Sequence, residues 1–234
     1  MSLIERTTPR NIKFTTEINP YAHGSVIAEF GNTKVHITAT VEENVPSWMR
    51  GKGSGWVTAE YNMLPGSTHT RSRRERNKVG GRTQEIQRLI GRALRAVVDM
   101  KKLGERMITL DCDVLVADGG TRTTSISGAY VALELAIQKL IKDGALRYSP
   151  INEPLAALSI GINKENKIIA DLNYEEDSSC ETDMNIVLTE SGKFIELQGT
   201  AEGSPFSREH LDALVDCSME AMKSVFAAQK EVLK

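Results

Sequence analysis

One stretch in the middle of the chain constrains the fold most, because a strand pattern passes directly into a helix pattern. It reads ITLDCDVLVADGGTRTTSISGAYVALELAI, from Ile108 to Ile137. Apolar and polar residues alternate in its first part, which predicts a half-buried strand. Apolar residues recur at helical spacing in its last part, and the following Asp143-Gly144 is a typical helix end. The sequence therefore predicts a strand and a helix joined by small residues.

The joining run, Gly119–Ser125, contains a single charged residue, Arg122. It precedes the predicted helix, where free backbone N–H groups and the positive end of the helix dipole attract anions. The simpler interpretation is that the glycines form a turn and Thr123–Ser125 cap the helix. That interpretation does not need Arg122, whose planar guanidinium suits a phosphate or a carboxylate. A second anion-binding group elsewhere would favour an anion site.

The overall composition is typical of a soluble globular protein. The chain has 234 residues, 40% of them hydrophobic and 26% charged, and no linker divides it, so we expect one domain over residues 1–234. No long apolar run or signal-peptide pattern occurs, which predicts a cytoplasmic location. Met1–Glu5 is expected to include part of an expression tag. Cys112, Cys180 and Cys217 are too widely spaced for a disulfide framework or a thiolate metal site. With a net charge of -2, contact with a polyanion requires a local basic patch.

Four further segments carry clear secondary-structure patterns. Gly24–Glu43 predicts a hairpin around Gly31-Asn32, and Leu155–Asp177 predicts a second hairpin. Thr83–Gly104 and the segment from about Ser207 onward predict two amphipathic helices. The order of these elements predicts an α+β protein with mixed sheets, in which two similar β/α halves share one core.

A strongly basic loop lies between the first hairpin and the helix at Thr83. From Arg71 to Lys78, five basic side chains stand against Glu75 alone, which gives a local net charge of +4. Four of the five are arginines: Arg71, Arg73, Arg74 and Arg76. One interpretation is a solvated, mobile loop. The other, which we favour, is an electrostatic guide for an RNA backbone, because arginine is well suited to phosphate contacts.

The same loop ends in GGRTQEI, where Gly80-Gly81-Arg82 precedes a predicted helix. Arg82 and Arg122 thus each follow a pair of glycines at or near a helix start. If the two junctions face each other, the two arginines could clamp one small anion between them. This second group favours an anion site over a simple helix cap.

An acidic segment, Asp171–Thr189, follows the second hairpin. A solvated acidic loop is the simpler interpretation for most of its carboxylates. Beside an anion site, however, carboxylates need a cation between them and the anion, and hard oxygen ligands suit Mg²⁺ or Mn²⁺. Asp177 and Asp183 would lie about 20 Å apart in a straight strand. If they share an ion, the chain must bend at Ser178-Ser179, and the chemistry alone does not select these two from their neighbours.

Five motifs together closely resemble one known family, the bacterial ribonuclease PH family. They read RGKGSGWVTAEYNMLP, GGRTQEIQRLIGRALRAVVD, LGERMITLDCDVLVADGGTRTTSISGAYVA, DLNYEEDSSCETDMN and FIELQGTAEGSPFSREHL. The resemblance begins at about Arg10 and covers nearly the whole chain. It implies the fold called ribosomal protein S5 domain 2-like, a homohexamer built as a trimer of dimers, and relatedness to polynucleotide phosphorylase and the exosome ring.

The resemblance also implies the residues of the site. The family's phosphate site, which takes inorganic phosphate as co-substrate, matches Arg82, Gly120, Thr121 and Arg122. The paired catalytic aspartates, with Mg²⁺ or Mn²⁺ as their metal, match Asp177 and Asp183. The loop that contacts tRNA in relatives holds Arg71, Arg73, Arg74 and Arg76.

Three departures from the family concern the RNA contacts. Gly66 follows Pro65 where relatives usually have arginine, and the loop before Gly81 is shorter. The N-terminal arm keeps only Arg6 and Arg10 of its usual basic pattern. The residues expected to carry the chemistry are unchanged.

The activity that the resemblance implies is phosphorolytic and reversible. Phosphate attacks the last phosphodiester of a tRNA precursor or another RNA 3′ end, and the nucleotide leaves as a nucleoside 5′-diphosphate. Because phosphate is already nucleophilic near neutral pH, alignment and charge neutralisation matter more than a strong base. Two alternatives stay open: a ring subunit that binds RNA without cutting it, and a hydrolytic nuclease that yields monophosphates.

Overall fold

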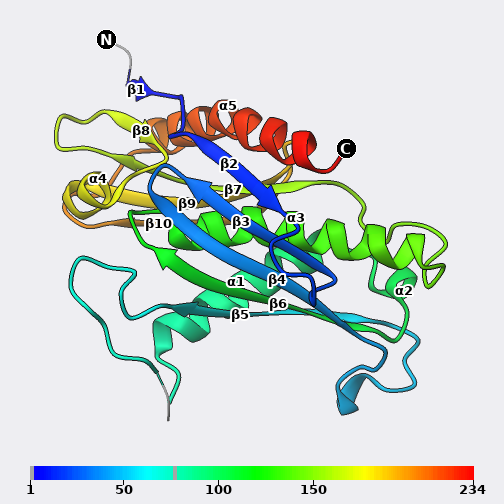
Figure 1. Cartoon of the computed structure of the whole chain (residues 1–234). Helices are drawn as coiled ribbons and strands as arrows, with labels where there is room; N and C mark the ends of the chain where they lie inside the picture. Colours follow the sequence, from blue (N-terminus) through cyan, green and yellow to red (C-terminus); the bar gives the residue numbers. More distant parts are fainter. Residues whose placement is uncertain (1–2, 76–77) are drawn as a thin grey trace.

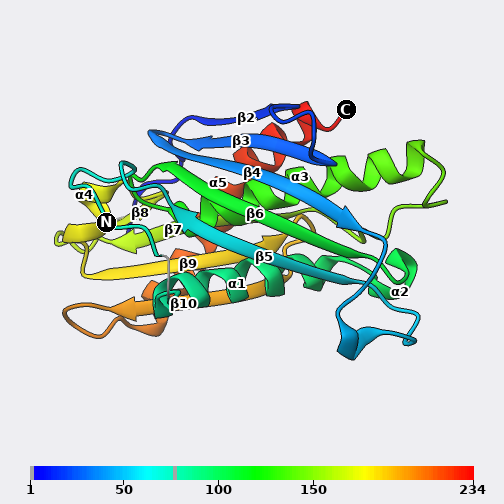
Figure 2. The ribbon, with the colours of Figure 1, turned by 60° about the horizontal axis from the view of Figure 1, so that its bottom comes forward.

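The structure, a computed structural model, describes residues 3–75 and 78–234 and has three layers. Two five-stranded sheets form the outer layers, and three long helices lie between them (Figures 1 and 2). The helices are α1 (Gly81–Val97), α3 (Thr121–Lys142) and α5 (Arg208–Val232). The α+β class with mixed sheets, predicted from the sequence, is confirmed.

The first sheet contains the predicted N-terminal hairpin. Its strand order is β2 (Ile12–Thr16), β3 (Gly24–Phe30), β4 (Thr33–Glu42), β6 (Met107–Val116) and β5 (Trp56–Met63). Neighbours are antiparallel except β5 and β6, which run parallel. The alternation read in the sequence is real: Val35, Ile37 and Ala39 of β4 are fully buried under the helices, whereas the residues between them face outward.

The second sheet is built from the C-terminal half and from the start of the chain. Its order is β1 (Ile4–Arg6), β8 (Ile168–Ala170), β7 (Leu155–Ile162), β9 (Thr182–Thr189) and β10 (Phe194–Ala201). The predicted second hairpin, β7 with β8, is confirmed. The parallel pairing of β1 with β8 shows that Ile4 and Glu5, which carried no weight in the sequence interpretation, belong to the fold.

The central helix α3 contacts both sheets, packing on β3 and β4 on one side and on β7 on the other. Its residues are therefore buried on almost every side, as expected for a helix inside a core. The amphipathic helices α1 and α5 flank it, α1 packing against β5 and β10, and α5 against β2 and β7. The N-termini of α1 and α3 are thus held by the core.

The helix boundaries correct the expectations for two helices and confirm the start of a third. The helix predicted for Thr83–Gly104 starts earlier, at Gly81, and is broken: Val98 is extended, and Asp99 caps the short α2 (Met100–Leu103). The central helix starts at Thr121, so the residues expected to cap it lie inside its first turns. The C-terminal helix begins as predicted, with the Ser207 hydroxyl accepting from the His210 N–H.

Two further short helices complete the described chain, η1 (Ser47–Met49) and α4 (Tyr174–Ser179). Cys112, Cys180 and Cys217 are buried and free, as expected. In the described ranges, none of the helices combines the length and the apolar character needed to cross a membrane.

Candidate functional site

The N-termini of α1 and α3 and the short helix α4 lie at one end of the molecule, where β6 also ends (Figure 1). The last residue before α3 is Gly120, with a left-handed backbone at φ 64°. No side chain caps this helix N-terminus, so the N–H groups of its first turn are open to an anion. Arg122 is the second residue of α3, and Arg82 is the second residue of α1.

The turn before α3 requires glycine because the acidic segment lies directly against it. A Cβ atom on Gly119, at φ 74°, would meet the Leu172 carbonyl oxygen at 2.3 Å and Asn173 atoms at 2.5 Å. A Cβ atom essentially never lies this close to a heavy atom to which it is not bonded. The close approach of backbone to backbone brings the start of α3 next to the start of α4.

Arg10 holds these two segments together. Its Nε and Nη2 donate to the Asp171 carboxylate at 2.9 and 2.7 Å, and its Nη1 donates to the Asp118 carbonyl. The side chain of Asp171 is completely buried, and the backbone of this residue is left-handed, at φ 57°. The charge of Arg10 compensates the buried carboxylate. Arg10 is therefore occupied inside the protein rather than free to contact RNA.

Arg6, the other basic residue kept in the N-terminal arm, is also bound within the protein. Its guanidinium forms a bidentate ion pair with Glu176 of α4, at 2.7 and 2.8 Å. Glu176 in turn completes a capping box with Asn173, which fixes the first turn of α4. Both arm arginines thus position the acidic segment.

The guanidinium of Arg122 is oriented by two side chains that sequence reasoning missed. Its Nη1 donates to Gln198 Oε1 of β10 at 3.0 Å and lies 3.7 Å from Glu85 Oε2 of α1. Gln198 also reaches Glu85, at 3.4 Å. A glutamine on the helix-facing side of an edge strand carries no sequence signal for this role.

The hydroxyl of Thr121 is oriented by Tyr61 of β5, a residue that the sequence analysis did not select. The buried Tyr61 hydroxyl donates to Thr121 Oγ1 at 3.0 Å. Because Thr121 accepts this bond, its own hydrogen remains available to an anion. The available signal was a tyrosine on the buried side of an alternating strand, after Val57 and Ala59, where a hydroxyl needs a partner.

The predicted bend between Asp177 and Asp183 exists, but it differs in kind from the expected turn at Ser178-Ser179. Asp177 lies in the short helix α4 and Asp183 in β9, so the chain changes direction where the helix ends after Ser179, and not at a two-residue turn. The two carboxylates interact: surrounding protein atoms desolvate Asp177 and raise its pKa, and the charge of Asp183 raises it further. A like-charged pair of this kind suits a shared cation or a shared proton.

Electrostatic interactions connect four residues that are expected to carry the chemistry: Arg82, Arg122, Asp177 and Asp183. Arg122 and Arg82 both act on the Asp177 carboxyl and oppose the rise of its pKa. The same two arginines act on Tyr61, whose pKa is raised by burial and lowered by Thr121 and by both guanidinium groups. Arg82 and Arg122 therefore lie near the same two groups, one acidic and one neutral, as a common anion site requires.

The metal hypothesis rests on a pair of carboxylates alone. Within the described ranges, no group of three or more His, Cys, Asp or Glu side chains is arranged to hold a metal ion. Asp177 and Asp183 fit a hard, mostly hydrated divalent ion, since Mg²⁺ commonly takes one or two carboxylates and fills its other positions with water and substrate phosphate.

The basic loop begins beside this site. Arg71, Arg73 and Arg74 are exposed, whereas Arg76 lies outside the described residues. Glu75, the one acidic residue of the loop, accepts from the Gly80 N–H at 2.9 Å and from the Thr83 hydroxyl at 3.2 Å. The loop is thereby attached to the start of α1. Among the ion pairs of the described residues, none includes Arg71, Arg73 or Arg74.

Comparison with known proteins adds independent information. Two family models match the chain: "3′ exoribonuclease family, domain 1" over residues 8–137 and "3′ exoribonuclease family, domain 2" over residues 153–221. Ribonuclease PH of Bacillus velezensis is 54% identical over 226 residues, which cover 96% of this chain and 92% of the relative. Ribonuclease PH of Bacillus subtilis is 55% identical over the same coverage.

Solved structures support the fold. Rrp46 from rice (Oryza sativa) superimposes with a TM-score of 0.80 at 15% identity, covering 98% of both chains. A chain of the Archaeoglobus fulgidus exosome, solved with RNA bound to the active site, gives a TM-score of 0.77 at 19% identity, covering 97% of this chain and 90% of that one. The S5 domain 2-like fold expected from the sequence is thus confirmed.

Proposed function

The chain belongs to the 3′ exoribonuclease family of ribonuclease PH, and from this membership we propose how its residues perform the family's reaction. The protein is a phosphorolytic 3′→5′ exoribonuclease, a tRNA nucleotidyltransferase. Inorganic phosphate is the attacking group, and nucleoside 5′-diphosphates are the products. The observation that carries the assignment of residues is the common influence of Arg82 and Arg122 on Asp177 and Tyr61.

The proposed phosphate site is the uncapped N-terminus of α3. Arg82 and Arg122 supply two guanidinium groups, and Gly120 and Thr121 supply backbone N–H groups and a hydroxyl. Charge-assisted bonds from arginine to phosphate are short and directional, so they align the anion as well as attract it. Alignment for in-line attack is the main requirement of phosphoryl transfer.

The proposed catalytic pair is Asp177 and Asp183, which would hold a Mg²⁺ or Mn²⁺ ion. Such an ion would supply charge neutralisation at the 3′ oxygen that leaves the RNA. The raised pKa of Asp177 also permits the alternative in which its carboxyl gives that oxygen a proton. In both cases, Arg6 and Arg10 hold the acidic segment against the start of α3.

The proposed RNA contacts lie in the basic loop, on Arg71, Arg73, Arg74 and Arg76. The exposure of the first three supports this role. The natural substrates would be tRNA precursors and other RNA 3′ ends, in the cytoplasm. Replacement of one exposed arginine by alanine should reduce the salt dependence of RNA binding by about 0.7 in slope for each single-strand phosphate that the protein no longer neutralises.

We also propose that the chain assembles as a homohexamer, a trimer of dimers. Support comes from β10, which stands at the edge of the second sheet and exposes Phe194 and Leu197 to solvent by 49% and 46%. Natural proteins seldom leave an apolar edge strand uncovered. Light scattering of the purified protein would test the assembly.

Product analysis tests the function as a whole. A uniformly labelled RNA is incubated with the enzyme and Mg²⁺, with and without inorganic phosphate. Nucleoside 5′-diphosphates that form only with phosphate are the expected result. Monophosphates formed without phosphate would indicate a hydrolytic nuclease, and intact RNA in both reactions would indicate a ring subunit that binds without cutting.

A further inference from the structure

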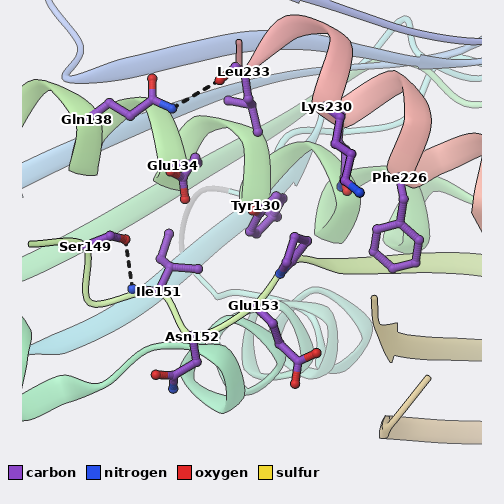
Figure 3. A pocket seen from close by; sticks show the side chains of 12 residues that line it. Tyr130, Glu134, Gln138, Ser149, Ile151, Asn152, Glu153, Phe226, Lys230 and Leu233 are labelled. Atoms are coloured by element: carbon purple, nitrogen blue, oxygen red, sulfur yellow. Dashed lines mark hydrogen bonds between the residues drawn. The ribbon is translucent and has the colours of Figure 1, made fainter. Parts of the chain in front are cut away.

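A cavity of about 290 Å³ lies between α3 and α5, away from the proposed phosphate site (Figure 3). Its lining residues come from successive turns of the two helices and from the loop that leads into β7. Glu134, at its centre, is twelve residues along α3 from Arg122, which corresponds to about 18 Å of helix rise. The volume is close to the lower limit of about 300 Å³ for small-molecule sites.

The cavity contains one carboxylate without a cationic partner. Burial raises the pKa of Glu134, and a hydrogen bond with Gln138 only partly opposes the rise. Among the described ion pairs, none includes Glu134. The other two carboxylates nearby are matched: Glu153 pairs with Lys193, and Glu190 with Lys230.

Two further polar groups of the cavity can accept a hydrogen bond. Gln229 is 1% exposed; its Nε2 donates to the Ser127 and Leu155 carbonyls, while its Oε1 has no partner among the described residues. Burial raises the pKa of Tyr130, and the charges of Glu134 and Glu190 raise it further, so the hydroxyl stays protonated. The cavity therefore presents a carboxylate without a cation, on Glu134, and a hydrogen-bond acceptor without a donor, Gln229 Oε1.

The remaining walls are apolar. Ile151, Phe226 and Leu233 line the cavity, and Figure 3 shows Glu134 and Tyr130 projecting from α3 toward the loop that carries Ile151. A partly buried carboxylate, a tyrosine ring and aliphatic walls together suit an ammonium group on an aliphatic stem. An anion would be repelled by Glu134, and an uncharged apolar molecule would leave Glu134 and Gln229 unmatched.

We propose that this cavity binds a small aliphatic amine, of the diamine or polyamine class, with one ammonium group on Glu134 and the aliphatic stem against Ile151 and Phe226. Gln229 Oε1 and the Tyr130 hydroxyl accept the remaining N–H bonds. Because α3 carries Thr121 and Arg122 of the proposed phosphate site at its other end, amine binding also stabilises the helix on which these two residues stand. The proposal does not depend on the reaction of the enzyme.

Calorimetric titration of the RNA-free protein with putrescine and spermidine tests the proposal, and 1,6-hexanediol serves as the uncharged comparison. We expect saturable binding of an amine and none of the diol. Glu134→Gln should weaken amine binding by at least about tenfold, because it removes a charge-assisted bond. Glu209→Gln, an exposed carboxylate at the start of α5, is the matched control and should leave the affinity unchanged.

Two further variants keep the test decisive. Gln138 is exposed at the cavity, so Gln138→Lys should fold normally and weaken amine binding by repulsion. The double variant Asp177→Asn with Asp183→Asn should bind the amine as the parent protein does, since those aspartates lie at the other end of α3. The proposal is overturned if neither amine binds at millimolar concentration, if Glu134→Gln and Gln138→Lys bind like the parent, or if only the aspartate variant loses binding. The cavity could instead be covered by a second copy of the chain. In that case the protein would self-associate whether or not amine is present, Glu134→Gln would change this self-association, and the proposal would equally be overturned.

Discussion

Arg10 encloses the buried carboxylate of Asp171 with three hydrogen bonds, from its backbone N–H at 2.9 Å, its Nε at 2.9 Å and its Nη2 at 2.7 Å. The two residues are 161 positions apart in the sequence, and their contact joins the N-terminal arm to the acidic segment. The remaining guanidinium nitrogen reaches the Asp118 carbonyl beside the turn of α3. The proposed phosphate site and the proposed metal site are therefore fixed to each other through one side chain.

Removal of Arg10 should destabilise the whole protein. Arg10→Ala leaves the Asp171 carboxylate buried without compensation, which we expect to lower the free energy of unfolding by about 3–5 kcal/mol. Arg208→Ala is the control, since Arg208 and Asp212 form an exposed pair on α5, and the expected cost there is about 0.5 kcal/mol. Urea unfolding followed by circular dichroism measures both. Equal costs for the two variants would contradict the assignment.

Loss of either site arginine should act on phosphate rather than on RNA. For Arg82→Ala and Arg122→Ala, we expect about a 100-fold loss of kcat/KM for phosphate, because in the proposed site each guanidinium stabilises charge that develops in the transition state. RNA affinity, measured by fluorescence anisotropy without phosphate, should change little. Arg147→Ala, which alters an exposed arginine in the loop before β7, should leave both quantities unchanged. Parallel loss of RNA affinity and phosphate use would argue against a dedicated phosphate site.

Gln198 should act as a positioning residue for Arg122. Gln198→Ala removes one hydrogen bond from the guanidinium, and we expect the KM for phosphate to rise about fivefold while kcat changes less. Steady-state kinetics with phosphate as the varied substrate separates the two constants. A fall in kcat at unchanged KM would place the role of Gln198 elsewhere.

The raised pKa of Asp177 predicts a pH-dependent gain of stability on its removal. A carboxyl whose pKa is raised in the folded state favours folding at low pH, and this contribution is lost as the pH rises through the folded-state pKa. Asp177→Asn does not titrate, so its Tm in EDTA should exceed that of the parent at pH 8. The difference should vanish below about pH 3, where the carboxyl is protonated in both states.

Metal binding should reverse this gain. A divalent ion held by Asp177 and Asp183 stabilises the folded parent protein, so Mg²⁺ in place of EDTA should raise its Tm and leave that of Asp177→Asn nearly unchanged. Differential scanning calorimetry at pH 8 measures both effects. A Tm for Asp177→Asn at or below that of the parent in EDTA would contradict the raised pKa of Asp177, which burial and the charge of Asp183 cause together.

The turn before α3 should tolerate no side chain at Gly119. Gly119 and Gly144 both have left-handed backbones, at φ 74° and 75°, but only Gly119 has protein atoms where a Cβ would stand. Gly144→Ala should cost about 1 kcal/mol for the backbone conformation alone. Gly119→Ala should cost at least about 3 kcal/mol, because steric overlap adds to that strain. Chemical denaturation of the two variants gives the comparison directly.

The sequence predicted the elements that depend on local patterns. The hairpin around Gly31-Asn32 and the Ser207 cap were expected, because turn chemistry and capping involve neighbouring residues. The start of α3 was placed too late, since the sequence pattern made Thr123–Ser125 look like a cap whereas Gly120 with a left-handed backbone begins the helix. The break after Val97 was missed, because apolar residues recur at helical spacing on both sides of it. The sequence did not show that Asp99 caps a separate short helix there.

The site was predictable only where it follows a motif. Arg82 and Arg122 were found from their glycine-flanked positions, but the side chain that accepts a hydrogen bond from Arg122 lies far away in the sequence: Gln198 is 76 residues from Arg122. Asp177 and Asp183 could not be selected from chemistry alone, because the six-residue helix α4 that turns one toward the other depends on capping by Asn173 and pairing with Arg6. Long-range pairing of this kind leaves no periodic signal.

The position of α3 between the two sheets has a consequence for the architecture of the polypeptide. The two family models meet in the interval between residues 137 and 153, just where α3 ends, yet α3 covers the inner face of both sheets. A polypeptide cut in that interval would give an N-terminal piece in which one side of its longest helix is exposed, and a C-terminal piece whose sheet keeps α5 but loses α3. Neither piece would be a self-sufficient folding unit, and the two would regain a native interior only by recombining.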